Sequence, residues 1–490
     1  MAISLLLVSC LVLATVPFFM RGLRFIFGAA FFASSLVFAL SVYTAIPLFL
    51  GAPAFENGYW YLDTFAALMV LLIGFIQWTA TITSIHYLGE EVRTGEITLP
   101  AVRRYFFFVG LFVCSMLLTI VSNNLGFMWI ALEATTLTTT LLVAFYAHKG
   151  SLEAAWKYLI LCSTGISLGL IGLFLTYYAA SSSGLLHGLG AISWTNLLTV
   201  APSLPPHLMQ IAFVFILIGY GTKVGLVPMH AWLPDAHSRA PSPISGMLSG
   251  ILLNAALFGI LRFRVLVDGS LASSEWTSEL FLVFGVLSCI IPAAFILIQA
   301  DYKRLLAYSS IEHMGLIVFS AGLGTVGAVA SVIHIVGHAL LKSALFFSAG
   351  NILLRFKSTK FDRIGQVMRT LPYTGALFLT LILMLLAIPP SPLFGSELLL
   401  ISQSVVLHPI FATIVLLALA IIFAGFIRLI IPFLFSPALV PPKSEVEVGE
   451  KWGWSHTAIA FHLILLVAFS VFLMTPMASP ILERIITAIS

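Results

Sequence analysis

The stretch "GYGTKVGLVPMHAWLPDAHSRAPSPISG", residues 219–246, decides how this chain folds. It begins like a membrane helix, places Lys223 among glycines and aliphatic residues, and reaches Pro228 five residues later. Proline has no N–H, so Pro228 would leave the carbonyl of Val224 without a helical partner and would kink the chain. Unpaired backbone at membrane depth is tolerated where it lines a wet or protein-filled cavity. The stretch therefore predicts a broken membrane helix whose break admits water to a buried lysine; a kink with only a packing role is the alternative.

The composition around this stretch excludes a soluble globular protein. The chain has 490 residues, of which 60% are hydrophobic and 9% charged, and its mean hydropathy is +1.10. Continuous apolar runs of roughly 20 residues are typical of membrane helices and not of barrel strands. We therefore expect an all-α polytopic membrane protein with no nucleic-acid partner. Its 14 predicted helices lie at 2–20, 25–49, 62–84, 104–121, 124–147, 154–180, 208–230, 243–266, 279–299, 304–322, 326–354, 373–403, 409–434 and 456–475.

The basic residues orient this predicted bundle, because loops on the cytoplasmic side carry an excess of Lys and Arg. With the N-terminus outside, 18 of the 23 Lys and Arg residues fall in inner loops or adjoining helix ends, among them Arg21, Arg24 and Lys443. Only Arg262, Arg264 and Arg484 fall outside, and an even number of helices returns the C-terminus to the same side. We expect a multi-pass protein of the cell (inner or plasma) membrane with both termini outside.

Ionisable residues inside the predicted helices are the candidates for function. A charge at the centre of a membrane helix costs about 2.5–3.5 kcal/mol on insertion scales, so such groups usually face the protein interior and serve ion paths. They are Glu133, Lys223, Glu312, Lys342 and Glu397, accompanied by His230, His313, His334 and His338. Glu133 has no charged neighbour in sequence, and Lys223 is its natural partner, because opposite charges offset each other's desolvation. Opening and closing of that pair would move protons; a static pair that fixes helix packing is the alternative.

The eleventh predicted helix carries three titratable groups on one face. In "SVIHIVGHALLKSALFF", His334, His338 and Lys342 are spaced at i, i+4 and i+8. Such a row suits a proton relay, because His changes charge near neutral pH and a buried Lys can be brought there. Packing histidines are the alternative. Two histidines four residues apart could also bind a metal, but the sequence offers no third ligand, so we expect no metal site.

The twelfth predicted helix repeats the pattern of the seventh. In "LLAIPPSPLFGSELLLISQ", prolines 389, 390 and 392 stand in mid-span and Glu397 follows. Two interrupted helices at matching positions predict two inverted five-helix repeats, helices 4–8 and 9–13. The expected divisions are 1–103 for the first three helices, 104–268 and 269–435 for the two repeats, and 436–490 for an inner loop, the last helix and a short tail.

The cysteines argue against a redox centre on this chain. Cys10, Cys114, Cys162 and Cys289 all lie in apolar helices with no CxxC or Cys/His ligand spacing. We expect them to be small core residues and expect no cofactor to bind here.

Three motifs carry a resemblance to a known family. They are "KVGLVPMHAWLPDAHSRAPSPISGMLSGILLNAALFGILRF", "DYKRLLAYSSIEHMG" and "HIVGHALLKSALFFSAGNI". They resemble the antiporter-like membrane subunits of respiratory complex I, Mrp-type sodium/proton antiporters and group 4 membrane-bound nickel–iron hydrogenases, over roughly residues 60–435. The stretch "YSSIEHMG" and the absence of a long C-terminal lateral helix resemble most the F-type component of hydrogenase-4 and formate hydrogenlyase.

The resemblance implies a proton path near the bilayer midplane. Glu133, Lys223 and Glu397 match the family's fifth-helix glutamate, broken-helix lysine and terminal twelfth-helix site, and the eleventh-helix groups match polar positions of some members. One departure is Asn254, where many relatives have a lysine or histidine. Because an amide does not titrate near neutral pH, the link from Lys223 to the second repeat would need water or the eleventh-helix groups.

Three further positions have a less defined expected role. Glu312 and His313 lie near the predicted inner start of the tenth helix, where they would cap it, meet Lys303 and Arg304, or take part in proton transfer. Asp235, with His237 and Arg239, is expected to order an inner loop after the broken helix or to line the proton entry.

The expected function is proton translocation by a membrane subunit of a multi-subunit oxidoreductase of the hydrogenase or formate hydrogenlyase type. The nickel–iron centre and iron–sulfur clusters would reside in peripheral partner subunits, beside other antiporter-like and small membrane subunits. The alternatives are an Mrp-type sodium/proton antiporter subunit, a complex I-type NADH:quinone oxidoreductase subunit, or a structural anchor. A sodium exchanger should show a carboxylate-rich site, whereas the acids in this sequence look isolated.

Overall fold

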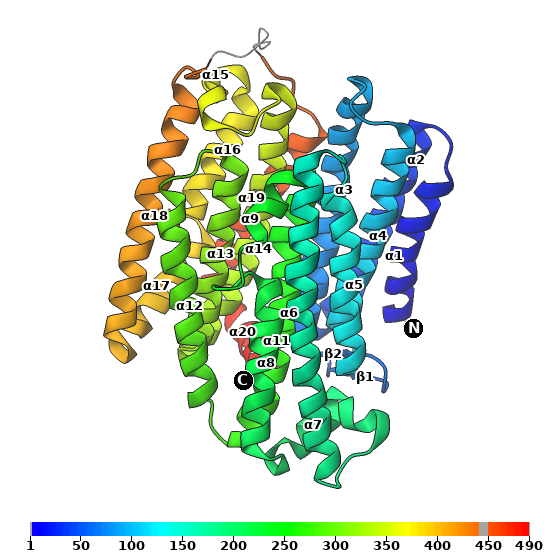
Figure 1. The fold of residues 1–490 in the computed structure, drawn as a ribbon, viewed down its shortest axis with the longest axis vertical. Coiled ribbons are helices and arrows are strands. Elements are labelled where there is room, and N and C mark those ends of the chain that lie inside the picture. The colour runs from blue at the N-terminus through cyan, green and yellow to red at the C-terminus, as the bar shows by residue number, and fades with distance from the viewer. Residues whose placement is uncertain (1, 441–448, 490) are drawn as a thin grey trace.

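The computed structural model describes residues 2–440 and 449–489, and these are almost entirely helical (Figure 1). The helices of the first half are α1 (Ala2–Phe19), α2 (Leu23–Phe49), α3 (Thr64–Arg93), α4 (Leu99–Val121), α5 (Leu125–Val143), α6 (Lys149–Ser182), η1 (Gly188–Ile192), α7 (Trp194–Val200), η2 (Ala201–Ser203), α8 (Pro206–Val224), α9 (Leu233–Arg239), α10 (Ser242–Met247), η3 (Leu248–Leu252) and α11 (Leu253–Leu271). Those of the second half are α12 (Glu275–Ile296), α13 (Tyr302–Ala321), α14 (Gly324–Phe356), η4 (Phe361–Arg363), α15 (Val367–Thr370), α16 (Pro372–Leu385), α17 (Pro392–Leu407), α18 (Pro409–Phe435), α19 (Trp454–Leu473) and α20 (Ala478–Thr487). Two short strands, β1 (Phe55–Glu56) and β2 (Tyr61–Leu62), pair antiparallel.

The membrane-spanning character of the chain is confirmed. Within the described ranges, 12 helices are long and apolar enough to cross a membrane. The other two of the 14 predicted segments correspond to α13, which is 20 residues long and buried along almost its whole length, and to the interrupted pair α16 and α17. The expected inner loop at 436–452, with Lys443, falls partly outside the described residues.

The first break lies between α8 and α9, and its cause differs from the predicted one. Helix α8 ends at Val224 because Gly225 adopts a left-handed conformation, with φ 83°, and its N–H bonds back to the carbonyls of Gly221 and Thr222. The helix therefore stops at a glycine cap three residues before Pro228, and the proline does not kink a continuous helix. The indole N–H of Trp232 also donates to the carbonyl of Thr222 at 2.8 Å, which holds the break beside Lys223.

The second break separates α16 from α17 in the second half of the chain. The hydroxyl of Ser391 donates to the carbonyl of Met384 at 2.6 Å and accepts from the N–H of Leu393 at 3.2 Å. One side chain thus satisfies a carbonyl at the end of α16 and an N–H at the start of α17. Both predicted interruptions are present.

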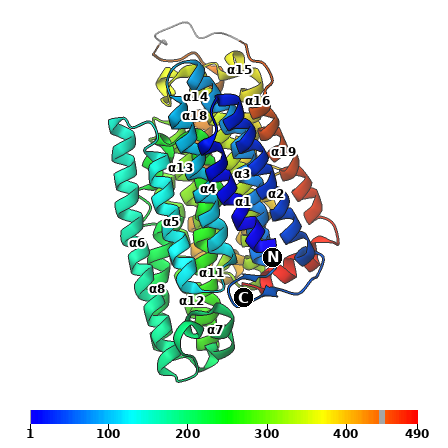
Figure 2. The ribbon, with the colours of Figure 1, turned by 90° about the vertical axis from the view of Figure 1, so that its right-hand side faces the viewer.

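Helix α14 runs through the interior of the bundle (Figures 1 and 2). It contacts α3, α10, α13, α16, α17 and α19. Both termini lie toward the end of the molecule that carries β1, β2 and α7, opposite the end that carries α15 (Figure 1). A polar face on α14 is therefore enclosed by protein on every side, which positions it for a path between the two halves.

Two arginines that were assigned to the outer side of the membrane from the sequence are buried in α11. Arg262 is 4% exposed and its Nη1 lies 2.6 Å from a carboxylate oxygen of Asp63. Its guanidinium also stacks 4.3 Å from the ring centroid of Trp194. Arg264 pairs with Asp268 of the same helix at 3.2 Å, and its guanidinium donates to the carbonyl of Ala321 of α13 at 2.6 Å and to the hydroxyl of Ser278 of α12 at 3.0 Å. These charges tie helices together, so they carry no information about which side they face.

Candidate proton-transfer sites

The first candidate site joins Glu133 of α5 to Lys223 of α8 through a threonine hydroxyl. Lys223 is fully buried, and its Nζ donates to the Oγ1 of Thr136 at 2.5 Å. The same hydroxyl donates to the Oε2 of Glu133 at 3.0 Å, and Ser163 donates to Oε1 at 2.7 Å. Glu133 and Lys223 are both described, and no direct ion pair joins them. The predicted partnership is therefore bridged: the two charged groups communicate through Thr136.

Close packing of α6 against α8 brings these groups together. A Cβ on Gly219 of α8 would lie 2.4 Å from the backbone nitrogen of Gly169 of α6, and a Cβ on Gly165 would lie 2.6 Å from Thr222. Small residues at membrane-helix interfaces allow this approach of backbones. The ring of Tyr158, also on α6, lies with its centroid 5.5 Å from the Nζ of Lys223. The lysine thus has a hydroxyl and an aromatic face as surroundings, with its carboxylate partner one hydroxyl away.

The second candidate site lies on the predicted face of α14. His334, His338 and Lys342 are all fully buried. Lys342 donates to the carbonyl of Leu306 at 3.0 Å and to the hydroxyl of Ser309, both on α13. The ring nitrogens of His338 have no hydrogen-bond partner among the described residues. The alignment of the three groups on one face is confirmed, and the face points to α13.

Helix α13 contributes Glu312 and His313, whose position along the helix could not be decided from the sequence. Glu312 and His313 lie in the middle of α13 and not at its start, where the side chain of Asp301 caps the helix by accepting from the N–H groups of Lys303 and Arg304. The Nδ1 of His313 lies 3.0 Å from the Nε2 of His334, and its Nε2 lies 3.5 Å from an Oε2 of Glu312. The capping alternative is therefore wrong, and both residues join the α14 site.

Glu397 of α17 completes this second site. A cavity of about 270 Å³ is lined by Ser309, Glu312 and His313 of α13, by Glu397, and by apolar residues of α16 and α18. Glu397 is half-buried, whereas Glu312 is 1% exposed and its Oε1 has no partner among the described residues. The acids of this region, which look isolated in the sequence, share one cavity. Ligand atoms of His313, His334 and Glu397 lie within 4.8 Å of one another, so the structure supplies the third metal ligand that the spacing along α14 did not.

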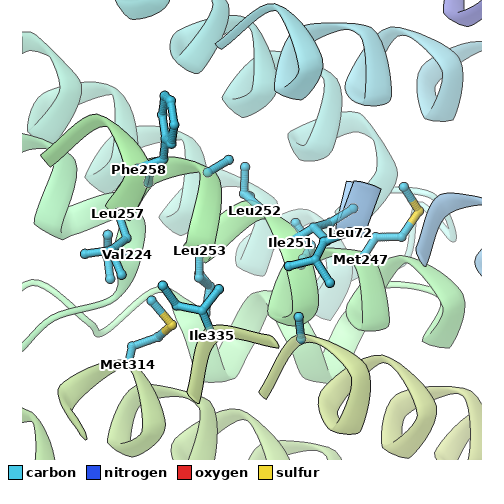
Figure 3. Packing of buried hydrophobic residues seen from close by; sticks show 14 of the residues in the cluster. Leu72, Val224, Met247, Ile251, Leu252, Leu253, Leu257, Phe258, Met314 and Ile335 are labelled. Atoms are coloured by element: carbon cyan, nitrogen blue, oxygen red, sulfur yellow. The ribbon is translucent and has the colours of Figure 1, made fainter. Parts of the chain in front are cut away.

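The region between the two sites is mostly apolar. Val224, next to Lys223, packs in a buried cluster with Leu253, Met314 and Ile335 (Figure 3). Beside this cluster the helix that contains α11 has a π-helical turn, Leu248–Leu252. Asn254 donates to the carbonyl of Gly250 at 2.8 Å, and its buried Oδ1 has no partner in the described chain. Asn254 is therefore a polar group placed to hold water beside this apolar cluster, and the buried hydroxyls of Ser249 and Ser310, which bond each other at 2.7 Å, lie in the same region.

The remaining predicted positions lie around the first break. His230 is half-buried and has one ring nitrogen, Nδ1, without a described partner. Asp235 and His237 lie on a short helix, α9, and not in a loop. Asp235 pairs with Arg304 and with Lys157, the latter at 3.3 Å. His237 is fully buried and stacks 5.3 Å from the ring of Phe346. Asp235 thus joins α9 to α6 and α13.

Two further charged residues, at the end of the bundle near α9, are buried although their sequence context indicates surface positions. Lys303 is fully buried and its Nζ donates to the carbonyl of Ala240 at 2.7 Å. Glu91 is 3% exposed and accepts from the hydroxyl of Tyr146 at 2.6 Å. Both stand at the ends of apolar runs, where charges are usually solvated, and no sequence signal distinguishes them from surface residues.

Comparisons with known proteins show which family this chain is similar to. The family described as "NADH:quinone oxidoreductase/Mrp antiporter, TM" matches residues 122–423. The chain is 40% identical over 359 residues to a hydrogenase-4 component F homolog of Methylacidiphilum infernorum, covering 73% of this chain and 75% of that protein. It is 29% identical over 360 residues to hydrogenase-4 component B of Escherichia coli, covering 71% of this chain and 51% of that protein.

Two solved structures share the fold along almost the whole chain. A chain of the membrane-bound sulfane sulfur reductase, an archaeal respiratory membrane complex, superposes with a TM-score of 0.84 at 22% identity, covering 99% of this chain and 96% of that one. A chain of respiratory complex I from Thermus thermophilus superposes with a TM-score of 0.75 at 21% identity, covering 96% and 97%. The resemblance seen in "HAWLPDAHSRAPSP" and the two other motifs is confirmed.

Proposed function

This chain belongs to the NADH:quinone oxidoreductase/Mrp antiporter membrane family, and from that membership we propose that it translocates protons as a subunit of a hydrogenase-4 or formate hydrogenlyase-like oxidoreductase. The observation that carries the proposal is the pair of buried ionisable sites, each beside an interrupted helix. The relatives named as hydrogenase-4 components support the choice of complex. The nickel–iron centre and iron–sulfur clusters would then belong to peripheral subunits, beside other antiporter-like and small membrane subunits.

The proposed mechanism is electrostatic. A buried ion's energy depends strongly on nearby charge, because the interior screens charge poorly. Redox work in the partner subunits would perturb Glu133, and the change would reach Lys223 through the Thr136 hydroxyl that contacts both. Lys223 would then release its proton toward water held at Asn254, whose buried Oδ1 has no partner among the described residues.

The second site would receive and deliver that proton. Lys342, His338 and His334 of α14 form a buried row that continues to His313 of α13, and proton exchange between His313 and His334 is supported by their 3.0 Å contact. Glu397, half-buried at the cavity, would release the proton to the outer side. This direction assumes that the basic loops face the cytoplasm, which places both termini outside an inner or plasma membrane.

Sodium coupling is the second candidate function, and one observation favours it. Glu312, Glu397 and Ser309 line the same cavity, and hard cations prefer oxygen ligands of this kind. A sodium/proton exchanger of the Mrp type would use these carboxylates for the ion, whereas a proton pump would use them for protons alone. Sodium dependence of transport separates the two candidates.

Identification of the partner subunits tests the proposed complex. We would purify the complex from its native membrane in mild detergent and identify by mass spectrometry the proteins that co-migrate with this chain. A nickel–iron hydrogenase large subunit together with iron–sulfur subunits is the expected result. Several small Mrp-like membrane subunits with no redox protein would contradict the proposal and favour ion exchange.

A further inference from the structure

Three metal-ligating side chains from three helices converge at the cavity of the second site. His313 comes from α13, His334 from α14 and Glu397 from α17, and one ligand atom of each lies within 4.8 Å of the others. We propose that these three residues bind a divalent transition-metal ion, for which Zn²⁺ is the best fit, and that the bound ion blocks proton transfer through them.

The identity of the ligands selects the ion. Two imidazoles and one carboxylate are a common three-ligand set for Zn²⁺, which leaves the fourth position to water. Hard cations such as Mg²⁺ and Ca²⁺ prefer sites built from oxygen alone. The cavity of about 270 Å³ beside Glu397 leaves room for the ion and its water, and Glu397 at its half-buried edge gives a charged entry point.

The separations are close to those that a tetrahedral ion requires. Zn–N distances of about 2.0–2.1 Å place two ligand nitrogens about 3.3 Å apart in tetrahedral geometry. The Nδ1 of His313 and the Nε2 of His334 face each other at 3.0 Å. The three ligand atoms lie within 4.8 Å of one another. Rotation of the Glu397 side chain would bring its carboxylate closer to the two histidines, because the two rings are held by packing.

The contacts made by the outward-facing nitrogens of the two histidine rings are the strongest support. Histidines that bind metals almost always direct their other ring nitrogen to an oxygen, which fixes the ring and its tautomer. Here the remaining nitrogen of His313 lies 3.5 Å from the Glu312 carboxylate, and that of His334 lies 3.0 Å from the Ser396 hydroxyl. His338 provides the contrast, because neither of its ring nitrogens has a described partner. The rings of His313 and His334, whose nitrogens face each other, are thus also the two rings whose other nitrogen contacts an oxygen.

A bound ion would arrest proton transfer for a chemical reason. Metal ligands must be deprotonated, so an ion that binds both facing nitrogens displaces the proton that they share. The same electron pairs could no longer accept a proton from Lys223. This step depends on the proposed function, whereas the binding of the ion does not.

Direct titration of the purified complex with Co²⁺ and Zn²⁺ tests the site without any turnover. Co²⁺ in a tetrahedral site gives intense visible absorption, which one equivalent of Zn²⁺ should remove. We expect one such site per chain, and we expect His334→Gln to weaken Zn²⁺ binding by more than about 100-fold. Glu312→Gln should weaken it by about 10- to 100-fold, the usual effect of losing an outer partner. The matched control is His338→Gln, on the same face of α14, which should change the affinity by less than about threefold.

The result that overturns the site is equal Zn²⁺ affinity in the wild type, His334→Gln and His338→Gln, which would identify an adventitious ion on surface histidines. If His334→Gln fails to assemble, Glu397→Gln replaces it, because that side chain is half-buried and its amide is nearly isosteric. Zn²⁺ binding with no effect on proton movement would retain the site and remove only its blocking role. Proton movement in His338→Gln tests the proposed function and not the metal site, because the metal site is judged by Zn²⁺ affinity.

Discussion

Replacing Thr136 with valine should disconnect Glu133 from Lys223 while leaving the shape of the site unchanged. The Thr136 hydroxyl accepts from the Nζ of Lys223 at 2.5 Å and donates to Glu133 at 3.0 Å. Valine fills nearly the same volume but has no hydroxyl, so both hydrogen bonds are lost at once. Glu133 keeps its bond from Ser163, whereas Lys223 loses the hydrogen bond that its ammonium makes in the described part of the chain.

The size of the effect follows from the charges involved. A hydrogen bond to a charged group contributes about 1.5–3 kcal/mol. Loss of one such bond from the state in which Glu133 and Lys223 are coupled reduces the population of that state about 10- to 150-fold. If proton transfer passes through this state, its rate in Thr136→Val should decrease by the same factor.

The assay is redox-driven acidification or alkalinisation of inverted membrane vesicles, followed with a pH-sensitive dye. The matched control is Thr135→Val: Thr135 is also fully buried, but within the described residues its hydroxyl bonds only to the backbone carbonyl of Leu132, at 2.6 Å. Both variants must retain the full subunit composition of the complex. Equal rates in Thr136→Val and Thr135→Val would refute the bridging role of the hydroxyl.

Three further changes test the packing and charge of the fold. Arg262→Met leaves Asp63 buried without its partner, and should destabilise the chain by about 3–5 kcal/mol, seen as a lower Tm that the added Asp63→Asn change partly restores; an unchanged Tm in Arg262→Met would contradict a buried pair. Gly219→Ala would bring a Cβ to 2.4 Å from Gly169 and should cost about 1–3 kcal/mol, whereas Gly28→Ala, with nothing within 4 Å, should be neutral in the same thermal scan. Burial alone would raise the pKa of Glu450, but hydrogen bonds from His456 and Thr374 lower it below its ordinary value. A depressed folded-state pKa stabilises the protein above the ordinary Glu pKa of about 4.3. The Tm advantage of the wild type over Glu450→Gln should therefore be full at neutral pH and disappear as the pH falls through the lowered pKa; an advantage independent of pH would refute this assignment.

The spans and both interruptions could be predicted from sequence because each depends on local chemistry. Apolar runs report burial in lipid, and the four-residue spacing of His334, His338 and Lys342 fixes a common helix face whatever surrounds it. The cause of the first break was less accessible. Glycine and proline both interrupt helices, and only the left-handed Gly225 decides that the helix ends before Pro228.

The partners of each buried group could not be predicted, because they come from other helices. Nothing in "EATTLTTT" distinguishes Thr136 from its neighbouring threonines, and its contact with Lys223 spans 87 positions. The meeting of His313, His334 and Glu397 likewise requires the packing of α13, α14 and α17. The same limitation made the acids look isolated, although Glu312 and Glu397 line one cavity.

The central claim is that the buried Lys223 carries protons, and Lys223→Met tests it most directly. Methionine keeps the length and volume of the lysine but cannot hold a proton. The measurement is the number of protons translocated per redox turnover in vesicles, with wild-type and variant complexes matched for subunit composition. We predict that Lys223→Met retains dye-linked redox activity in its partner subunits and loses at least nine-tenths of the translocated protons. A ratio of protons to turnovers equal to that of the wild type would contradict the account.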